Sequence, residues 1–162
     1  MRILGIDPGL ATIGLGLIEA ENSHNVSVID WLTITTPAGL SVGERLIEIK
    51  KDLDTFIKES QPELIVIEKI FFATNKRTAI DVAQARGIIL CIAMESGAEI
   101  LEATPLQLKS CIAGDGAADK LQIQTMVQRT LKLSELPKPD DAADGLALAL
   151  YGAFTHKTMA IV

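Results

Sequence analysis

Four consecutive apolar residues, Leu64-Ile65-Val66-Ile67, lie between Pro62 and the acidic Glu68. A strand with one face in water alternates apolar and polar residues, whereas a strand covered on both faces is apolar throughout. This run has the length of a strand and shows no alternation. It therefore predicts a central strand in a sheet that carries helices on both faces.

The rest of the chain supplies the other elements of such a sheet. The predicted strands are Arg2–Asp7, Leu15–Glu19, Val26–Thr36 and Glu99–Ala103, with a turn at Glu21–Asn25. Five helices are predicted. The first is capped by Ser41 and Glu44 and ends before Pro62, and the third begins at Thr104-Pro105. The second, fourth and fifth are Thr78–Ser96, Ala118–Leu131 and Asp140 to about His156. Three strands followed by alternating helices and strands predict an α/β fold with a mixed five-stranded sheet, in one domain over residues 1–162.

Amino-acid composition excludes fewer classes of function than the order of apolar and polar residues does. The net charge is −6, which disfavours a nucleic-acid binder only if the cations are spread evenly over the surface. The start of the chain has no signal-peptide layout and no run reaches about 18 apolar residues, so we expect a cytoplasmic protein without a membrane partner. Cys91 and Cys111 are expected to be reduced core thiols.

Four acidic residues lie in apolar surroundings, where a charged side chain is energetically unfavourable. Asp7 and Glu68 each end an apolar strand, and Asp141 and Asp144 share one face at the start of an otherwise apolar helix. Strand ends and helix N-termini are where α/β folds collect ligand groups. If the two strands are neighbours, the carboxylates converge, and a divalent cation would relieve their repulsion. Oxygen ligands favour Mg²⁺ or Mn²⁺, and two such ions would activate a water for attack on a phosphodiester.

Each acid also has an ordinary structural explanation. Asp7 suits the start of a turn, and Glu68 suits an ion pair with a neighbouring lysine. Asp141 suits the first turn of a helix, and this is the preferred interpretation for Asp140. Asp144 lies beyond the cap of that helix and is harder to explain in this way. It is the joint placement of the acids that points to a metal site.

Several motifs, in order, resemble the RuvC family of Holliday-junction resolvases. They are Leu4-Gly5-Ile6-Asp7-Pro8-Gly9 with Gly14 and Gly16, Ile67-Glu68-Lys69-Ile70-Phe71, Gln84-Ala85-Arg86-Gly87, and Asp141-Ala142-Ala143-Asp144-Gly145-Leu146-Ala147. The resemblance covers nearly the whole chain. It departs at Gly145, where alanine is common and where glycine is expected to loosen the helix.

The resemblance implies a ribonuclease H-like fold and a role in DNA recombination and repair. A homodimer would bind a four-way DNA junction, and each subunit would nick one of two strands of like polarity with Mg²⁺. Asp7, Glu68, Asp141 and Asp144 would be the metal-binding catalytic acids. The family also implies work with a branch-migration motor complex, for which no binding motif is legible.

DNA-binding residues follow from the same resemblance. Lys109 and Lys120 align with lysines that face DNA near the cut, and Phe71 matches a position that stacks on a base at the junction centre. Lys76 and Arg77, which flank the loop after Glu68, are also expected to contact DNA. Without the resemblance, the lysines would be read as solvated helix surface and a loop phenylalanine as a core residue.

The helix predicted at Thr78–Ser96 carries an apolar stripe, Ile80, Ala83, Gly87, Ile88 and Cys91. The stripe suits either the core or, by the resemblance, a dimer contact. Three rival functions remain open for the chain. They are a sugar-kinase or actin-like ATPase, for which 162 residues are too few, a nuclease of this fold with another substrate, and a DNA-binding scaffold that no longer cuts.

Overall fold

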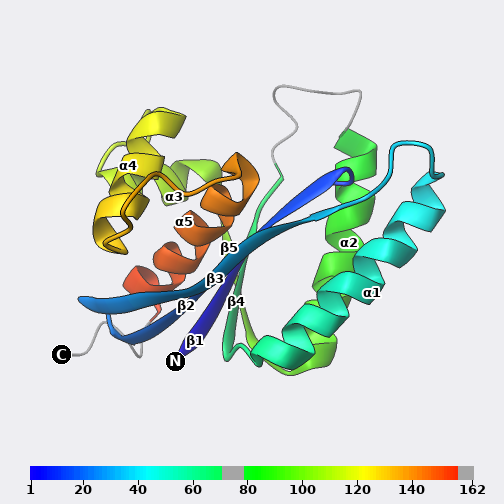
Figure 1. Ribbon diagram of the computed structural model, residues 1–162, viewed down its shortest axis with the longest axis horizontal. Coiled ribbons are helices and arrows are strands. Elements are labelled where there is room, and N and C mark those ends of the chain that lie inside the picture. Colours follow the sequence, from blue (N-terminus) through cyan, green and yellow to red (C-terminus); the bar gives the residue numbers. More distant parts are fainter. Residues whose placement is uncertain (71–78, 157–162) are drawn as a thin grey trace.

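A five-stranded sheet with helices on both faces forms the molecule in a computed structural model, which describes residues 1–70 and 79–156 (Figure 1). The strands are β1 (Arg2–Asp7), β2 (Thr12–Asn22), β3 (Asn25–Thr35), β4 (Leu64–Glu68) and β5 (Glu99–Ala103). The helices are α1 (Val42–Ser60), α2 (Ala79–Ser96), α3 (Pro105–Ala113), α4 (Lys120–Thr130) and α5 (Asp140–Thr155). The predicted mixed five-stranded sheet is confirmed.

The strand order is β3-β2-β1-β4-β5. Strand β2 is antiparallel to both β1 and β3, whereas β4 is parallel to β1 and β5 is parallel to β4. The adjacent, parallel strands β1 and β4 therefore end at the same edge of the sheet. Asp7 and Glu68 are the last residues of these two strands. This register places the two acids side by side, as the sequence required for a shared site.

Two apolar layers sandwich the sheet. The helices α1 and α2 cover one face, and α3, α4 and α5 cover the other (Figure 1). Ile65 and Ile67 of β4 pack toward α1 and α2, whereas Leu64 and Val66 pack toward α5, and all four side chains are fully buried. The apolar run therefore is a central strand covered on both faces.

Several element boundaries differ from the sequence predictions. The second strand runs from Thr12 rather than from Leu15, because Gly14 and Gly16 remain in its ladder although they give no alternating signal. The fourth helix begins at Lys120, two residues later than predicted, where Asp119 forms a capping box. The capping box predicted at Ser41 and Glu44 is present at the start of α1.

The prediction of two core thiols is wrong. Cys91 is exposed on α2 and Cys111 is only partly buried. Cys91 lies on the outward side of α2 because the helix uses its other side, with Ala85, Ile89 and Ile92, to pack on the sheet. Within the described ranges, none of the helices has the length and apolar character needed to cross a membrane.

Candidate metal centre

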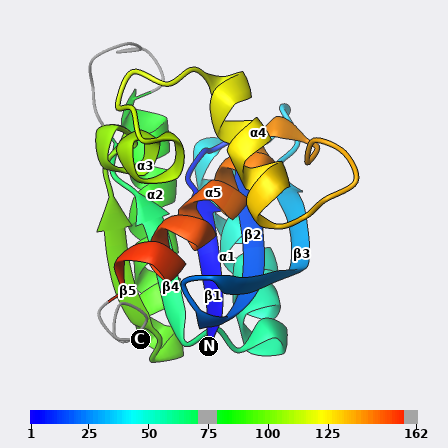
Figure 2. The ribbon, with the colours of Figure 1, turned by 90° about the vertical axis from the view of Figure 1, so that its left-hand side faces the viewer.

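Helix α5 lies directly on the sheet over β1 and β2 (Figure 2). Glycines make this close approach possible. A Cβ at Gly14 would lie 1.7 Å from the carbonyl oxygen of Asp141, and one at Gly16 would lie 2.2 Å from the backbone nitrogen of Leu146. Gly14 is also the ladder partner of Asp7. The missing side chains thus let the first turns of α5 descend onto the strand beside Asp7.

Gly145 completes this contact from the helix side. A Cβ there would lie 2.7 Å from the backbone nitrogen of Gly16. The helix runs unbroken through this position, from Asp140 to Thr155. Gly145 therefore serves close packing of α5 on β2, and the expected loosening of the helix is not seen.

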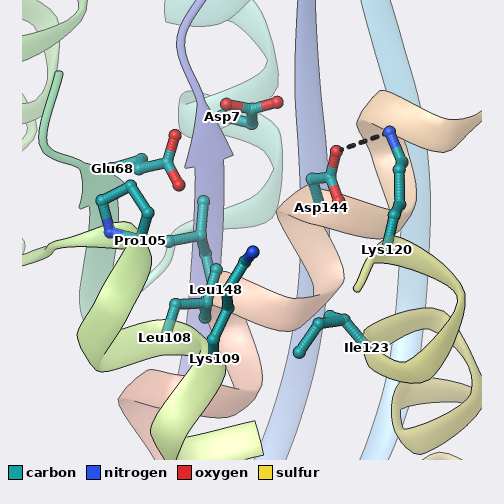
Figure 3. Close-up of a pocket in the computed structure, with 9 residues that line it drawn as sticks. All are labelled: Asp7, Glu68, Pro105, Leu108, Lys109, Lys120, Ile123, Asp144 and Leu148. Atoms are coloured by element: carbon teal, nitrogen blue, oxygen red, sulfur yellow. Dashed lines mark hydrogen bonds and ion pairs between the residues drawn. The ribbon is translucent and has the colours of Figure 1, made fainter. Parts of the chain in front are cut away.

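Three carboxylates meet where α5 touches β1. One carboxylate oxygen each from Asp7, Asp141 and Asp144 lies within 4.8 Å of the others. Glu68 is not part of this closest group, but it lines the same pocket as Asp7 and Asp144 (Figure 3). Asp7 lies between Glu68 and Asp144 in that view. The structure therefore brings all four predicted acids to one edge of the sheet, with Glu68 on the far side of Asp7.

The acids lie in an environment that disfavours their charged forms. Burial, and then the charges of Glu68, Asp144 and Asp141, raise the pKa of Asp7 well above its ordinary value. Burial and the charge of Asp144 raise the pKa of Glu68 to about 7. Burial also raises the pKa of Asp144, although Lys120 opposes this. Carboxylates that are held together and poorly solvated gain most from a shared cation.

Two lysines border the pocket from the helices above it. The Nζ of Lys120 lies 3.1 Å from an oxygen of Asp144 and 3.5 Å from one of Asp140. Lys109 of α3 lines the same pocket and lowers the pKa of Glu68. Two of the predicted DNA-binding residues therefore reach the acids from separate helices. Phe71, Lys76 and Arg77 lie outside the described residues.

The pocket itself measures about 200 Å³, and its apolar lining is formed by Pro105, Leu108, Ile123 and Leu148. Its charged lining consists of Asp7, Glu68, Asp144 and the two lysines (Figure 3). The donor set offers carboxylate oxygens without thiolate or imidazole, which suits a hard divalent cation. The residues present therefore fit a metal centre that handles a charged ligand.

Two contacts beside the site were not anticipated from the sequence. The Nε of Arg86 donates to the carbonyl oxygen of Glu68 over 3.0 Å. The Nε1 of Trp31 donates to the carbonyl oxygen of Lys138 over 3.0 Å, just before α5 begins. Both bonds join residues far apart in the chain. The only available signal for Arg86 was its place in the Gln84–Gly87 motif, which assigned it no partner.

Comparisons with known proteins extend over nearly the whole chain. A family model described as Crossover junction endodeoxyribonuclease RuvC matches residues 3–152. A protein of that name from Syntrophomonas wolfei subsp. wolfei is 48% identical over 150 residues, which are 93% of this chain and 87% of the relative. Another from Chloroflexus aurantiacus is 45% identical over 159 residues, 98% of this chain and 96% of the relative. The structure of Thermus thermophilus RuvC in complex with a Holliday junction substrate has a TM-score of 0.90 at 31% identity, covering 98% of this chain and 96% of that one.

Proposed function

Because the chain belongs to the RuvC family of crossover junction endodeoxyribonucleases, we propose that it resolves four-way DNA junctions by metal-dependent nicking of two strands of like polarity. The observation that carries this proposal is the group of carboxylates from β1 and α5 within 4.8 Å of one another. The similar Thermus thermophilus structure holds a Holliday junction substrate, which supports a junction as the ligand. The acids are intact, which argues against a scaffold that only binds.

Divalent metal use is a property of this nuclease family, and the acids of this chain fit such an ion. We assign metal binding and catalysis to Asp7, Glu68, Asp141 and Asp144, with Mg²⁺ as the ion and Mn²⁺ as a substitute. Two ions bound there would activate the attacking water and stabilise the leaving oxygen of the phosphodiester. Apolar side chains from α3, α4 and α5 line the same pocket beside these acids.

Lys109 and Lys120 are assigned to the scissile phosphate. Both line the pocket, Lys109 from α3 and Lys120 from α4 (Figure 3). The ammonium of Lys120 pairs with Asp144 and Asp140, so it is held close to the reacting position. A cation there stabilises charge that develops on the phosphate in the transition state. Phe71, Lys76 and Arg77 keep their proposed DNA contacts from the sequence.

A homodimer accounts for an exposed apolar stripe on α2. Ile80, Ala83, Gly87 and Cys91 of the predicted stripe are exposed, whereas Ile88 is partly buried against the core. Met94 extends the exposed stripe, and Ile80 and Met94 are 70% and 69% exposed. An apolar surface of this kind marks an interaction site. Two copies related by a two-fold axis would match the symmetry of a junction and supply two active sites. A branch-migration motor complex as partner and a cytoplasmic location remain predictions.

Incubation with a synthetic four-way junction tests the proposed function. With Mg²⁺ we expect paired nicks at symmetric positions in two strands of like polarity, and without a divalent ion we expect none. RNA–DNA hybrids and plain duplex of the same sequence are parallel substrates that separate the rival nuclease functions. Preferential cutting of either would contradict junction resolution.

An Asp7→Asn variant tests the site within the same assay. The amide keeps the size of the side chain but removes a charge from the closest acid group. We expect junction binding to persist, measured by gel shift in the absence of divalent ions, while nicking falls below detection. Nicking at the wild-type rate would remove Asp7 from the metal site.

A further inference from the structure

Arg86 contacts the end of β4 from the face of the sheet opposite the acids. It lies two turns into α2, between the buried Ala85 and the exposed Gly87, and its side chain is only 18% exposed. Its Nε donates to the carbonyl oxygen of Glu68 over 3.0 Å, and its Nη2 pairs with the carboxylate of Glu102 on β5. One guanidinium therefore ties together α2, β4 and β5.

The carbonyl of Glu68 lies where pairing with β1 has ended, although Glu68 is still paired with Ala103 of β5. Pairing between β1 and β4 ends with Ile6 opposite Ile67, one residue before Glu68. On the β5 side, the N–H of Lys69 donates to the carbonyl of Ala103 over 2.8 Å. Arg86 supplies a donor to the Glu68 carbonyl itself, so the peptide after Glu68 is held from both β5 and α2.

The contact acts from behind the site. Ile67 packs on the α2 side of the sheet, and successive residues of a strand face opposite sides, so the Glu68 side chain points to the α5 side, where it lines the pocket. The hydrogen bond from Arg86 goes to the backbone of that residue. A planar guanidinium that makes two directed bonds fixes such a backbone more firmly than a single ammonium can.

We infer that Arg86 is a positioning residue, which, with Glu102, sets the direction of the Glu68 carboxylate through the backbone. The inference rests on the proposed role of Glu68 as a metal ligand. Residues that orient ligands without touching the metal typically contribute about 10–100-fold to metal affinity or activity. This role explains the presence of Arg86 in the Gln84–Gly87 motif, since Arg86 belongs neither to the pocket lining nor to the exposed stripe of α2.

Mn²⁺ binding to the metal-free protein, measured by calorimetry, tests this inference without relying on nicking. We expect Arg86→Ala to weaken Mn²⁺ binding about 10–100-fold. Junction binding without divalent ions should stay at the wild-type level, since Arg86 lies behind the sheet. We expect Arg86→Lys and Glu102→Gln to fall between wild type and Arg86→Ala, because each keeps part of the contact. These two milder variants carry the test if Arg86→Ala does not fold.

Arg2→Ala is the matched control. The Nη1 of Arg2 donates to the carbonyl oxygen of Ser60 over 2.8 Å at the opposite end of the sheet. Its loss removes the same kind of bond and should leave Mn²⁺ affinity unchanged. A lower melting temperature of Arg86→Ala with wild-type Mn²⁺ affinity would overturn the positioning role. If Glu68→Gln also leaves that affinity unchanged, the metal assignment itself fails, and this inference fails with it.

Discussion

At the scale of single residues, Glu68 differs from the other acids in what surrounds it. Asp7, Asp141 and Asp144 form the closest group, whereas Glu68 reaches the pocket from the neighbouring strand. Burial and the charge of Asp144 nevertheless raise its pKa to about 7. In the metal-free protein this carboxyl therefore keeps its proton at pH values where it is ionised in the unfolded chain.

This difference predicts how the stability of the metal-free protein depends on pH. Below the ordinary pKa of 4.5, Glu68 is protonated in both states and its full contribution is present. As the pH rises toward 7, the unfolded chain loses this proton first, so stability falls, by up to about 3 kcal/mol. Urea unfolding of wild type and Glu68→Gln at pH 5 and pH 8 measures this, and the variant should lose less stability. An equal loss in both proteins would contradict the raised pKa.

Mg²⁺ should reverse that loss. The ion binds ionised carboxylates of the folded state, so at pH 8 it stabilises the wild type more than it does at pH 5. Thermal unfolding with and without Mg²⁺ at the two pH values checks this. We expect Asp7→Asn to show a much smaller rise in melting temperature at pH 8, since the amide lacks the negative charge that Asp7 contributes to the closest acid group.

Lys120 offers a second residue-scale prediction. We expect Lys120→Ala to slow nicking at saturating junction by about 100-fold, the effect of losing one group that stabilises transition-state charge. Junction affinity should fall less and become less sensitive to salt. Lys51→Ala, which removes an equal charge from the exposed surface of α1, is the control and should nick normally. A rate for Lys120→Ala equal to that of the control would exclude Lys120 from the reaction.

At the scale of elements, the seat of α5 on the sheet decides whether the acids meet. The helix carries Asp141 and Asp144, and the strands beneath it supply glycines at the points of contact. Side chains at these points would lift the first turns of the helix away from Asp7. The same packing thus serves the stability of the fold and the geometry of the site.

Gly14→Ala tests this seat. The added Cβ would lie 1.7 Å from the carbonyl oxygen of Asp141, so backbone must move. We expect the free energy of unfolding to fall by about 3 kcal/mol or more, and Mn²⁺ binding to weaken in whatever folds. Gly43→Ala, at an exposed position of α1, meets no atom within 4 Å and should be neutral or stabilising by up to about 1 kcal/mol. Equal stability of the two variants would show that α5 tolerates displacement.

The sequence predicted the elements well and their contacts poorly. Apolar patterning, together with caps and turn residues, located every strand and helix of the described ranges, and it placed Asp7 and Glu68 at strand ends. It did not extend the second strand to Thr12, because glycines carry no polar or apolar signal. Convergence of the acids required an assumption about which strands are neighbours. The Arg86–Glu68 contact could not be predicted, because every residue has a backbone carbonyl and the residue type at position 68 therefore does not indicate such a bond.

At the scale of the whole molecule, the pocket and the exposed apolar stripe of α2 lie on opposite faces of the sheet. The pocket with its acids and lysines belongs to the side of α3, α4 and α5, whereas the exposed apolar stripe lies on α2 (Figures 1 and 3). A dimer formed through α2 would leave both pockets open to DNA. The net charge of −6 is compatible with this arrangement, because DNA at the pocket would meet the lysines gathered there rather than the average charge of the molecule.

The double substitution Ile80→Glu and Met94→Glu tests whether that stripe joins two subunits. Both side chains are about 70% exposed, so charges there cost a monomer little, whereas a two-fold contact would bury four carboxylates. We expect the dimer dissociation constant, measured by light scattering over a dilution series, to rise about 100-fold or more. Leu121→Glu on α4, at a position 60% exposed on the other side of the sheet, should not change it. In the proposed homodimer each subunit would cut one strand, so the monomeric variant should make single, unpaired nicks, and paired nicks from a proven monomer would contradict the two-site arrangement.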